Sequence, residues 1–134
     1  MNYKYGVYGM DSIDIYLSNL QKINEMTLDD YGDKGKVRKN NKLAKDNRQI
    51  ATDIENIYPE YKEEFAKLLF DGNWKIRCQV AHHMLEVMNY PEEYRKLALD
   101  EIKGVISKNI PVESLGNKMW LQQWYELHPQ DELL

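Results

Sequence analysis

The residues best suited to chemistry lie close together in the segment FDGNWKIRCQVAHHMLEV, from Phe70 to Val87. This segment holds the chain's one cysteine, Cys78, and two adjacent histidines, His82 and His83. Residues four apart lie on the same side of a helix, so Cys78 and His82 could bind one metal ion. They could equally act as a nucleophile and its base. Each role needs further groups from the rest of the chain.

Those further groups are missing from the sequence. A closed zinc site needs four ligands, whereas the chain has no second cysteine, and its third histidine, His128, lies near the end. No motif marks an oxyanion site or an acid that would orient a histidine base. Cys78 also falls on an apolar stripe, where a free cysteine behaves as a small hydrophobic residue. We therefore expect no enzyme activity, catalytic residue, metal or cofactor, and we expect the histidines on or beside an exposed strip.

Composition limits the class of protein. A chain of 134 residues with 43% hydrophobic residues fits one globular domain with one core. No apolar run approaches the roughly 20 residues of a membrane span, and the N-terminus lacks the pattern of a secretory signal. A single cysteine cannot form an internal disulfide, which favours a reducing cytoplasm. We expect a cytoplasmic protein without membrane contact.

The charge is unevenly distributed. The segment from Lys34 to Arg48 has seven Lys or Arg residues and one acid, Asp46, so it carries +6 and the remainder −10 within a net charge of −4. We expect this segment to be ordinary surface that pairs with the acidic remainder. Nucleic-acid binding is the alternative, because three lysines approximate one helical face: Lys39, Lys42 and Lys45. The acidic remainder makes nucleic acid the less favoured partner.

Apolar residues recur at helical spacing throughout the chain, and strand-like alternation is nearly absent. This pattern predicts six helices joined by short turns. The expected ranges are about 12–26, 34–57, 60–70 and 74–88, then one helix from 91 and one after 111. In the last helix the expected apolar positions are Val112, Leu115, Met119, Trp120 and Trp124. Residues 1–11 and 129–134 are expected to be flexible or loosely packed ends of a single domain, 1–134.

The helix expected from Trp74 to Met88 has two adjacent apolar stripes that together cover more than half of its circumference. Such a helix must be packed on several sides, as an inner helix of a layered stack is. Asn73 is the natural N-cap, because its side chain can accept from free amides of the first turn. The remaining polar strip comprises Lys75, Gln79, His82, His83 and Glu86.

The stretch LLFDGNWKIRCQVAHHMLEV, Leu68 to Val87, resembles a HEAT repeat. A helix ending in leucines, a short turn with an acid and a helix beginning with Ile76-Arg77 carry the resemblance. It implies a right-handed stack of about six antiparallel helices, a HEAT-like α-solenoid. It further implies that Asp71 and Arg77 tie neighbouring units together and that Ala81 allows close helix approach.

The likeness extends over roughly Ile13 to Leu127. Over that length the chain is similar to a small bacterial family of HEAT-like domains whose members include candidate immunity proteins of toxin systems. The resemblance implies a non-enzymatic protein-binding module, an immunity protein that neutralises a toxin. The acidic remainder of the chain suits a basic toxin domain as partner. The residues expected to bind it are Lys75, Gln79, His82, His83, Glu86, Lys118, Gln122 and Gln123.

The aromatic residues leave two alternatives open. Trp120, Trp124 and Tyr125 are expected in the core, although aromatic residues also anchor protein interfaces. Tyrosines crowd the N-terminal part, and they either pack across the first helix or contact a partner. These tyrosines are Tyr3, Tyr5, Tyr8 and Tyr16.

Overall fold

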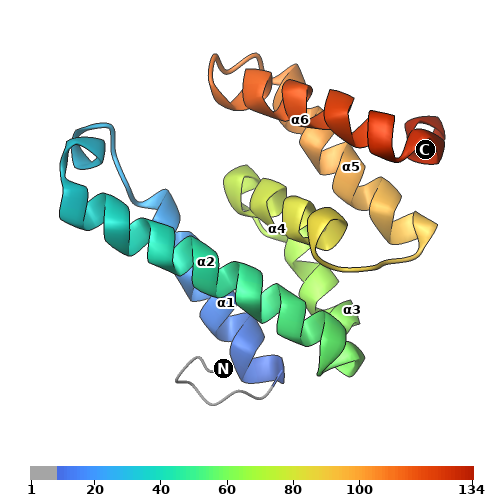
Figure 1. Cartoon of the computed structure of the whole chain (residues 1–134), viewed down its shortest axis with the longest axis horizontal. Coiled ribbons are helices and arrows are strands. Elements are labelled where there is room, and N and C mark those ends of the chain that lie inside the picture. The colour runs from blue at the N-terminus through green and yellow to red at the C-terminus, as the bar shows by residue number, and fades with distance from the viewer. Residues whose placement is uncertain (1–8) are drawn as a thin grey trace. The chain divides into compact units, whose positions relative to one another are not determined.

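The computed structural model describes the backbone from residue 9 and the side chains from residue 11 to the end of the chain at 134. Within these bounds the chain forms six α-helices and four short 3-10 helices and no strand, which confirms the all-α prediction (Figure 1). The predictions for Tyr3, Tyr5 and Tyr8 lie outside the described residues. No helix in the described part is long and apolar enough to cross a membrane.

The chain divides into two compact units, Met1–Leu68 and Leu69–Leu134. The elements of the first unit are α1 (Gly9–Asn24), η1 (Asp29–Gly32), α2 (Lys34–Asn56), η2 (Pro59–Tyr61) and α3 (Lys62–Ala66). A short 3-10 helix, η3 (Lys67–Phe70), joins the two units. The second unit contains α4 (Trp74–Glu86), α5 (Glu92–Ser107), α6 (Glu113–Leu127) and η4 (Pro129–Leu133).

Short polar side chains begin the helices that the sequence predicted best. Asp33 caps α2 by accepting from the amides of Gly35 and Lys36, and Asn73 caps α4 by accepting from the amide of Lys75 at 2.9 Å. The N-cap prediction for Asn73 is therefore confirmed. The helix predicted at 60–70 is instead a short α-helix between two 3-10 turns, as is common where a helix has few residues between its ends.

The first unit is built on α1 and α2, which lie side by side and run in opposite directions (Figure 1). Tyr16 of α1 and Phe65 of α3 are fully buried, and their rings meet edge to face with centroids 4.8 Å apart. Such an aromatic pair adds directional attraction to the burial of apolar area. The other large buried apolar side chains of this unit are Ile13, Leu20, Ile50 and Ile54.

A buried amide pair links α1 to α2. Asn19 donates to the side-chain oxygen of Asn47 at 3.0 Å, and Asn47 donates to the backbone carbonyl of Tyr16 at 3.1 Å. Asn47 is fully buried. A buried amide must be hydrogen-bonded, so this pair fixes how the two helices align.

In the second unit α4 and α6 both pack on α5 (Figure 1). The prediction that α4 is wrapped by neighbours is confirmed, because Val80 and Ala81 are fully buried and Leu85 is 6% exposed. The buried residues of α5 are Ala98, Leu99, Ile102 and Val105. In α6 only Ser114 is buried among the described residues.

The apolar stripe predicted for the core side of α6 is therefore wrong. Val112 is 78% exposed, Leu115 is 58% exposed and Met119 is 53% exposed. These three residues share one side, at spacings of three and four, and all three are exposed. Periodicity identifies an apolar side of a helix, but it does not identify what covers that side.

Arg77 is hydrogen-bonded both to α5 and to the turn before α4. Its Nε donates to the Glu101 carboxylate of α5 at 2.8 Å, and its Nη1 donates to the backbone carbonyl of Asp71 at 2.7 Å. The carboxylate of Asp71 instead accepts from the amide of Asn73 in the turn. Arg77 thus joins the turn before α4 to α5, and Glu101 is the acid that pairs with it.

The predicted loose tail is held in place by Asp131, which is 2% exposed in η4. Arg95 of α5 donates to its Oδ1 at 2.9 Å, and Trp124 Nε1 of α6 donates to its Oδ2 at 3.0 Å. Burial raises the pKa of Asp131, but the bonds from Arg95 and Trp124 outweigh it and hold the pKa below the usual 3.8. Residues Pro129–Leu133 form η4, which packs against α6.

Replacing Asp131 with Ala tests this contact. Removal leaves Arg95 and the Trp124 indole without their acceptor, so we expect the free energy of unfolding of the second unit to fall by about 2 kcal/mol. Urea denaturation followed by tryptophan fluorescence measures it, because all three tryptophans lie in this unit.

Glu132→Ala is the matched control, since Glu132 is the exposed neighbour of Asp131. The control should change stability by less than about 0.5 kcal/mol. Because the pKa of Asp131 is lowered on folding, its contribution should persist above pH 4 and disappear as the pH falls below its folded value. Equal effects of the two substitutions would contradict the role of Asp131.

Candidate functional site

The candidate residues Cys78 and His82 lie on the side of α4 that meets α6. His82 Nε2 lies 2.7 Å from Asn117 Oδ1 of α6, and Cys78 Sγ lies 3.4 Å from the same oxygen. Asn117 donates its Nδ2 to the backbone carbonyl of Glu113 at 2.8 Å, so its Oδ1 is the atom turned towards α4. Cys78 and His82 therefore share one acceptor. We name this contact, with Glu86 and Trp120, the α4–α6 seam.

The partners of His82 determine its protonation. Nε2 faces an amide oxygen and must donate, while Nδ1 lies 3.3 Å from the carboxylate of Glu86. Both ring nitrogens thus face acceptors, which is the arrangement of an imidazolium. Burial opposes the charge, but hydrogen bonds with Cys78, Glu86 and Asn117 raise the pKa of His82 from 6.5 to about 10.

Glu86 receives a second donor from α6. Trp120 Nε1 donates to Glu86 Oε2 at 2.7 Å, and the Trp120 ring meets the His82 ring edge to face at 4.5 Å. From there the aromatic rings continue along α6, because Trp120 stacks on Trp124 at 5.1 Å and Trp124 stacks on His128 at 3.8 Å. This ladder is half-buried and structural, and its indole N–H groups are bonded to Glu86 and Asp131.

The geometry gives Cys78 and His82 a structural role. A histidine that donates from both nitrogens has no lone pair with which to take a proton from Cys78. Cys78 is 7% exposed, so a substrate could not reach its sulfur without movement of the helices. Across the described residues no three His, Cys, Asp or Glu side chains are placed to hold a metal ion.

The predicted partner-binding residues divide into two groups. His82 and Glu86 contact α6 through the seam, and the His82 side chain is 23% exposed, so it lies beside the exposed strip of α4. Lys75 is exposed, with its ammonium 5.8 Å from the ring centroid of Trp74, and Gln79 and His83 are half-buried. The three predicted residues of α6 are all exposed: Lys118, Gln122 and Gln123.

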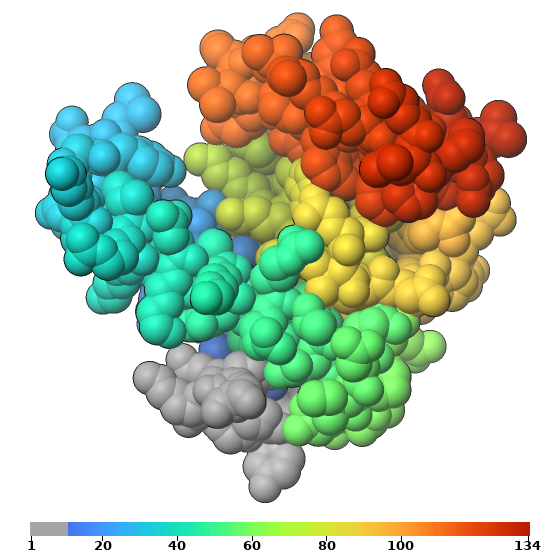
Figure 2. Space-filling view, in the orientation of Figure 1, coloured from blue at the N-terminus to red at the C-terminus, as the bar shows by residue number. Residues whose placement is uncertain are grey.

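One side of α6 is exposed along its length, and of the residues on it the sequence had indicated only Gln122 as a contact surface. Residues at spacings of three and four place five exposed side chains along it, and we name this set the α6 outer face. Figure 2 shows the side chains of α6, coloured orange-red to red, on the face turned to the viewer. The α6 outer face comprises Val112, Leu115, Met119, Gln122 and Glu126.

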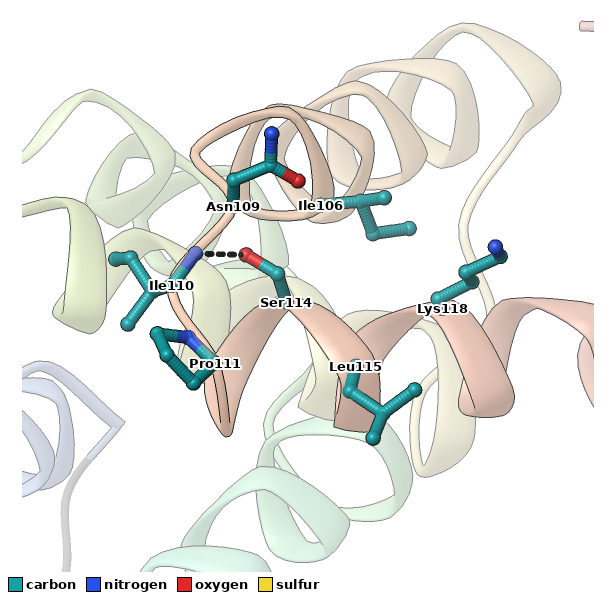
Figure 3. A pocket seen from close by; sticks show the side chains of 7 residues that line it. All are labelled: Ile106, Asn109, Ile110, Pro111, Ser114, Leu115 and Lys118. Carbon is teal, nitrogen blue, oxygen red and sulfur yellow. Dashed lines mark hydrogen bonds between the residues drawn. The ribbon is translucent and has the colours of Figure 1, made fainter.

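A pocket of about 310 Å³ adjoins the apolar end of the α6 outer face (Figure 3). Ile106, Ile110 and Leu115 give it apolar walls, and Lys118 is its charged residue. The turn between α5 and α6 forms part of the pocket wall. Two hydrogen bonds hold this turn, because Ser114 Oγ accepts from the amide of Ile110 at 2.8 Å and donates to the backbone carbonyl of Val105 at 2.7 Å. The pocket is thus a fixed apolar hollow beside an exposed apolar stripe.

The other end of the α6 outer face is acidic. A shallow hollow there is lined by Gln122, Tyr125, Glu126 and Glu132. No cation among the described residues is paired with Glu126 or Glu132. The α6 outer face therefore changes from apolar at its start to negatively charged at its end.

Comparison with known proteins adds no relative. No protein-family model matches the chain, and neither a curated protein nor a solved structure matches it significantly. The resemblance to HEAT repeats therefore depends on the residues quoted for it, and the immunity role stays a prediction.

A pH titration of the histidine ring signals by NMR tests the seam. We expect His82 to keep its second proton well above pH 6.5, and Asn117→Ala to lower its pKa by removing an acceptor. Because the folded pKa lies above the unfolded one, His82 should stabilise the fold fully below about pH 6.5, and this contribution should be lost as the pH rises towards 10.

His82→Gln should accordingly flatten the loss of stability over that pH range. Cys78→Ser serves as the control, because a serine keeps a donor beside Asn117 in place of the thiol. A His82 ring that titrates at its ordinary value near 6.5 in the folded protein would show that the seam carries no imidazolium.

Proposed function

We propose that this chain is a non-enzymatic protein-binding module and that the α6 outer face is its main contact surface. The observation that carries the proposal is the exposure of Val112, Leu115 and Met119 on one side of a regular helix. Single exposed apolar residues are ordinary, but a contiguous apolar row with an adjoining hollow is typical of a protein interface.

The energetics support a partner of protein size. Burying one large aliphatic side chain stabilises a complex by roughly 1.5–3 kcal/mol before the costs of association are subtracted. Three such side chains in a row match the spacing at which a partner helix presents its own apolar residues. The pocket beside Leu115 supplies the concave site in which one side chain of the partner could anchor.

The charge distribution favours a basic partner. Residues 69–134 contain 7 basic and 10 acidic side chains, a formal charge of −3 with neutral histidines. Glu126 and Glu132 lie unpaired at one end of the contact surface, where they can attract a Lys or Arg of the partner. Opposite charge of this kind accelerates association more than it tightens the final complex.

The resemblance to immunity proteins gives the partner a specific identity. A toxin domain of basic charge, encoded beside this chain and bound one to one, would fit both the apolar row and the acidic end. The HEAT-like stacking of helix pairs belongs to the same proposal, because it would make α6 the outermost helix of the second pair. Support for a non-enzymatic role comes from His82, whose two ring nitrogens both face acceptors.

The experiment uses the purified chain and the purified product of an adjacent gene, with Kd measured by calorimetry. Leu115→Glu places a charge in the centre of the apolar row, and we expect Kd to rise on the order of thirtyfold, about 2 kcal/mol. The fold should persist, since Leu115 is 58% exposed.

Leu127→Glu is the matched control, because Leu127 lies on the same helix, is 76% exposed and is outside the α6 outer face. It should leave Kd within about twofold, which corresponds to less than 0.5 kcal/mol. A complex that tolerates Leu115→Glu as well as Leu127→Glu would move the interface elsewhere. The absence of a complex with any neighbouring gene product would remove the immunity role.

A further inference from the structure

The first unit has a basic pocket that the sequence did not reveal. It has a volume of about 200 Å³ and lies between the end of α1 and the first turns of α2. Lys22 of α1 lines it together with Lys36 and Lys39 of α2. Its remaining residues are Glu25, Met26, Asn40 and Leu43. We name it the α1–α2 basic pocket.

Two of the three lysines form no ion pair with the part of the chain that the structure describes. Lys36 forms an ion pair with Asp30 at 2.9 Å, and this bond lowers the pKa of Asp30 to about 2. The Asp30 carboxylate therefore balances much of the Lys36 charge. Lys22 and Lys39, by contrast, have no ion pair with any residue from 9 to 134. Both are exposed, so each ammonium is free to meet a ligand.

The shape of the pocket is fixed by contacts between the two helices. Asn40 Nδ2 donates to the backbone carbonyl of Ile23 at 3.5 Å, and Asp33 caps the start of α2. The NH₂ group of Asn40 therefore points to α1. The lysines therefore project from a stable corner between α1 and α2. The packing of these two helices already places them near one another.

We propose that the α1–α2 basic pocket binds a phosphate group. Two unpaired ammonium groups on neighbouring helices match the charge of a phosphate ester, which is between −1 and −2 at neutral pH. A volume of about 200 Å³ admits a phosphate with part of the group that carries it, and Met26 and Leu43 offer apolar contact to that group. Glu25 is the one acidic residue in the lining, against three lysines.

The phosphate could come from a small phosphorylated molecule or from a nucleic-acid backbone. The basic charge continues along α2 beyond the pocket, where four more cationic side chains are exposed: Arg38, Lys42, Lys45 and Arg48. The charge of Lys42 is partly balanced by an ion pair with Asp46 at 3.0 Å. A backbone would use this extension, whereas a small molecule would use the pocket alone.

The test measures binding of two probes to the whole chain at about 50 mM salt, where phosphate contacts are strong. One probe is inorganic pyrophosphate, followed by the amide NMR signals of residues that line the pocket. The other is a fluorescent single-stranded oligonucleotide, followed by anisotropy over a range of salt concentrations. Binding of pyrophosphate alone identifies a small-molecule site, and binding of the oligonucleotide identifies a backbone site.

The variant Lys22→Ala/Lys39→Ala should weaken whichever probe binds by on the order of tenfold. For the single-stranded oligonucleotide it should also reduce the slope of log K against log salt by about 1.4, which is about 0.7 for each lost contact. Lys67→Ala is the matched control, an exposed lysine of the same unit outside the pocket, and it should have no effect. The proposal is overturned if neither probe binds, or if the double variant binds both probes as well as the unchanged chain does.

Discussion

The second unit depends on one constraint, which is that α5 has a single buried apolar face and that both α4 and α6 pack on this helix. Ala98, Leu99 and Ile102 are fully buried there, and α4 and α6 both pack on this helix. Because α4 brings two apolar stripes of its own, it takes most of the available apolar contact. Little apolar surface of α5 is left for α6 to pack on, and Ser114 is the one buried residue of α6. The helix must therefore be held by something other than apolar burial.

Hydrogen bonds along its length hold α6 in place. At its start, Ser114 bonds to the turn and to the end of α5, and in the middle Trp120 donates to Glu86. At its end Trp124 and Arg95 share the carboxylate of Asp131. Each bond contributes about 1 kcal/mol in net terms, more where a charge takes part. The charged His82 belongs to this set, which explains why an imidazole within a helical unit keeps its proton.

The sequence predicts the helices well and their surroundings poorly, for physical reasons that differ between residues. The cap Asn73 and the buried stripes of α4 follow from local geometry, so they were predictable. Val112, Leu115 and Met119 have the spacing of a core stripe, but whether a stripe is covered depends on a partner helix that periodicity does not encode. Lys22 joins Lys39 only because α1 and α2 pack side by side, so no local signal places them together. Asp131, near the C-terminus, resembles an ordinary solvated acid until Arg95 and Trp124 are found beside it.

The division of labour within α6 explains how a marginally buried helix can serve as a binding surface. Side chains that hold α6 in place point towards α4, α5 and η4, whereas the α6 outer face contributes nothing to those bonds. Substitution of an outer residue such as Leu115 should therefore affect association without unfolding the helix. Conversely, weakening the seam should reduce binding indirectly, because an α6 that loses its hydrogen bonds no longer presents Leu115 and Met119 as one row. Stability and recognition thus depend on different sides of the same helix. The hydrogen bonds on the polar side hold α6 in place, so that the apolar residues on the other side can contact a partner.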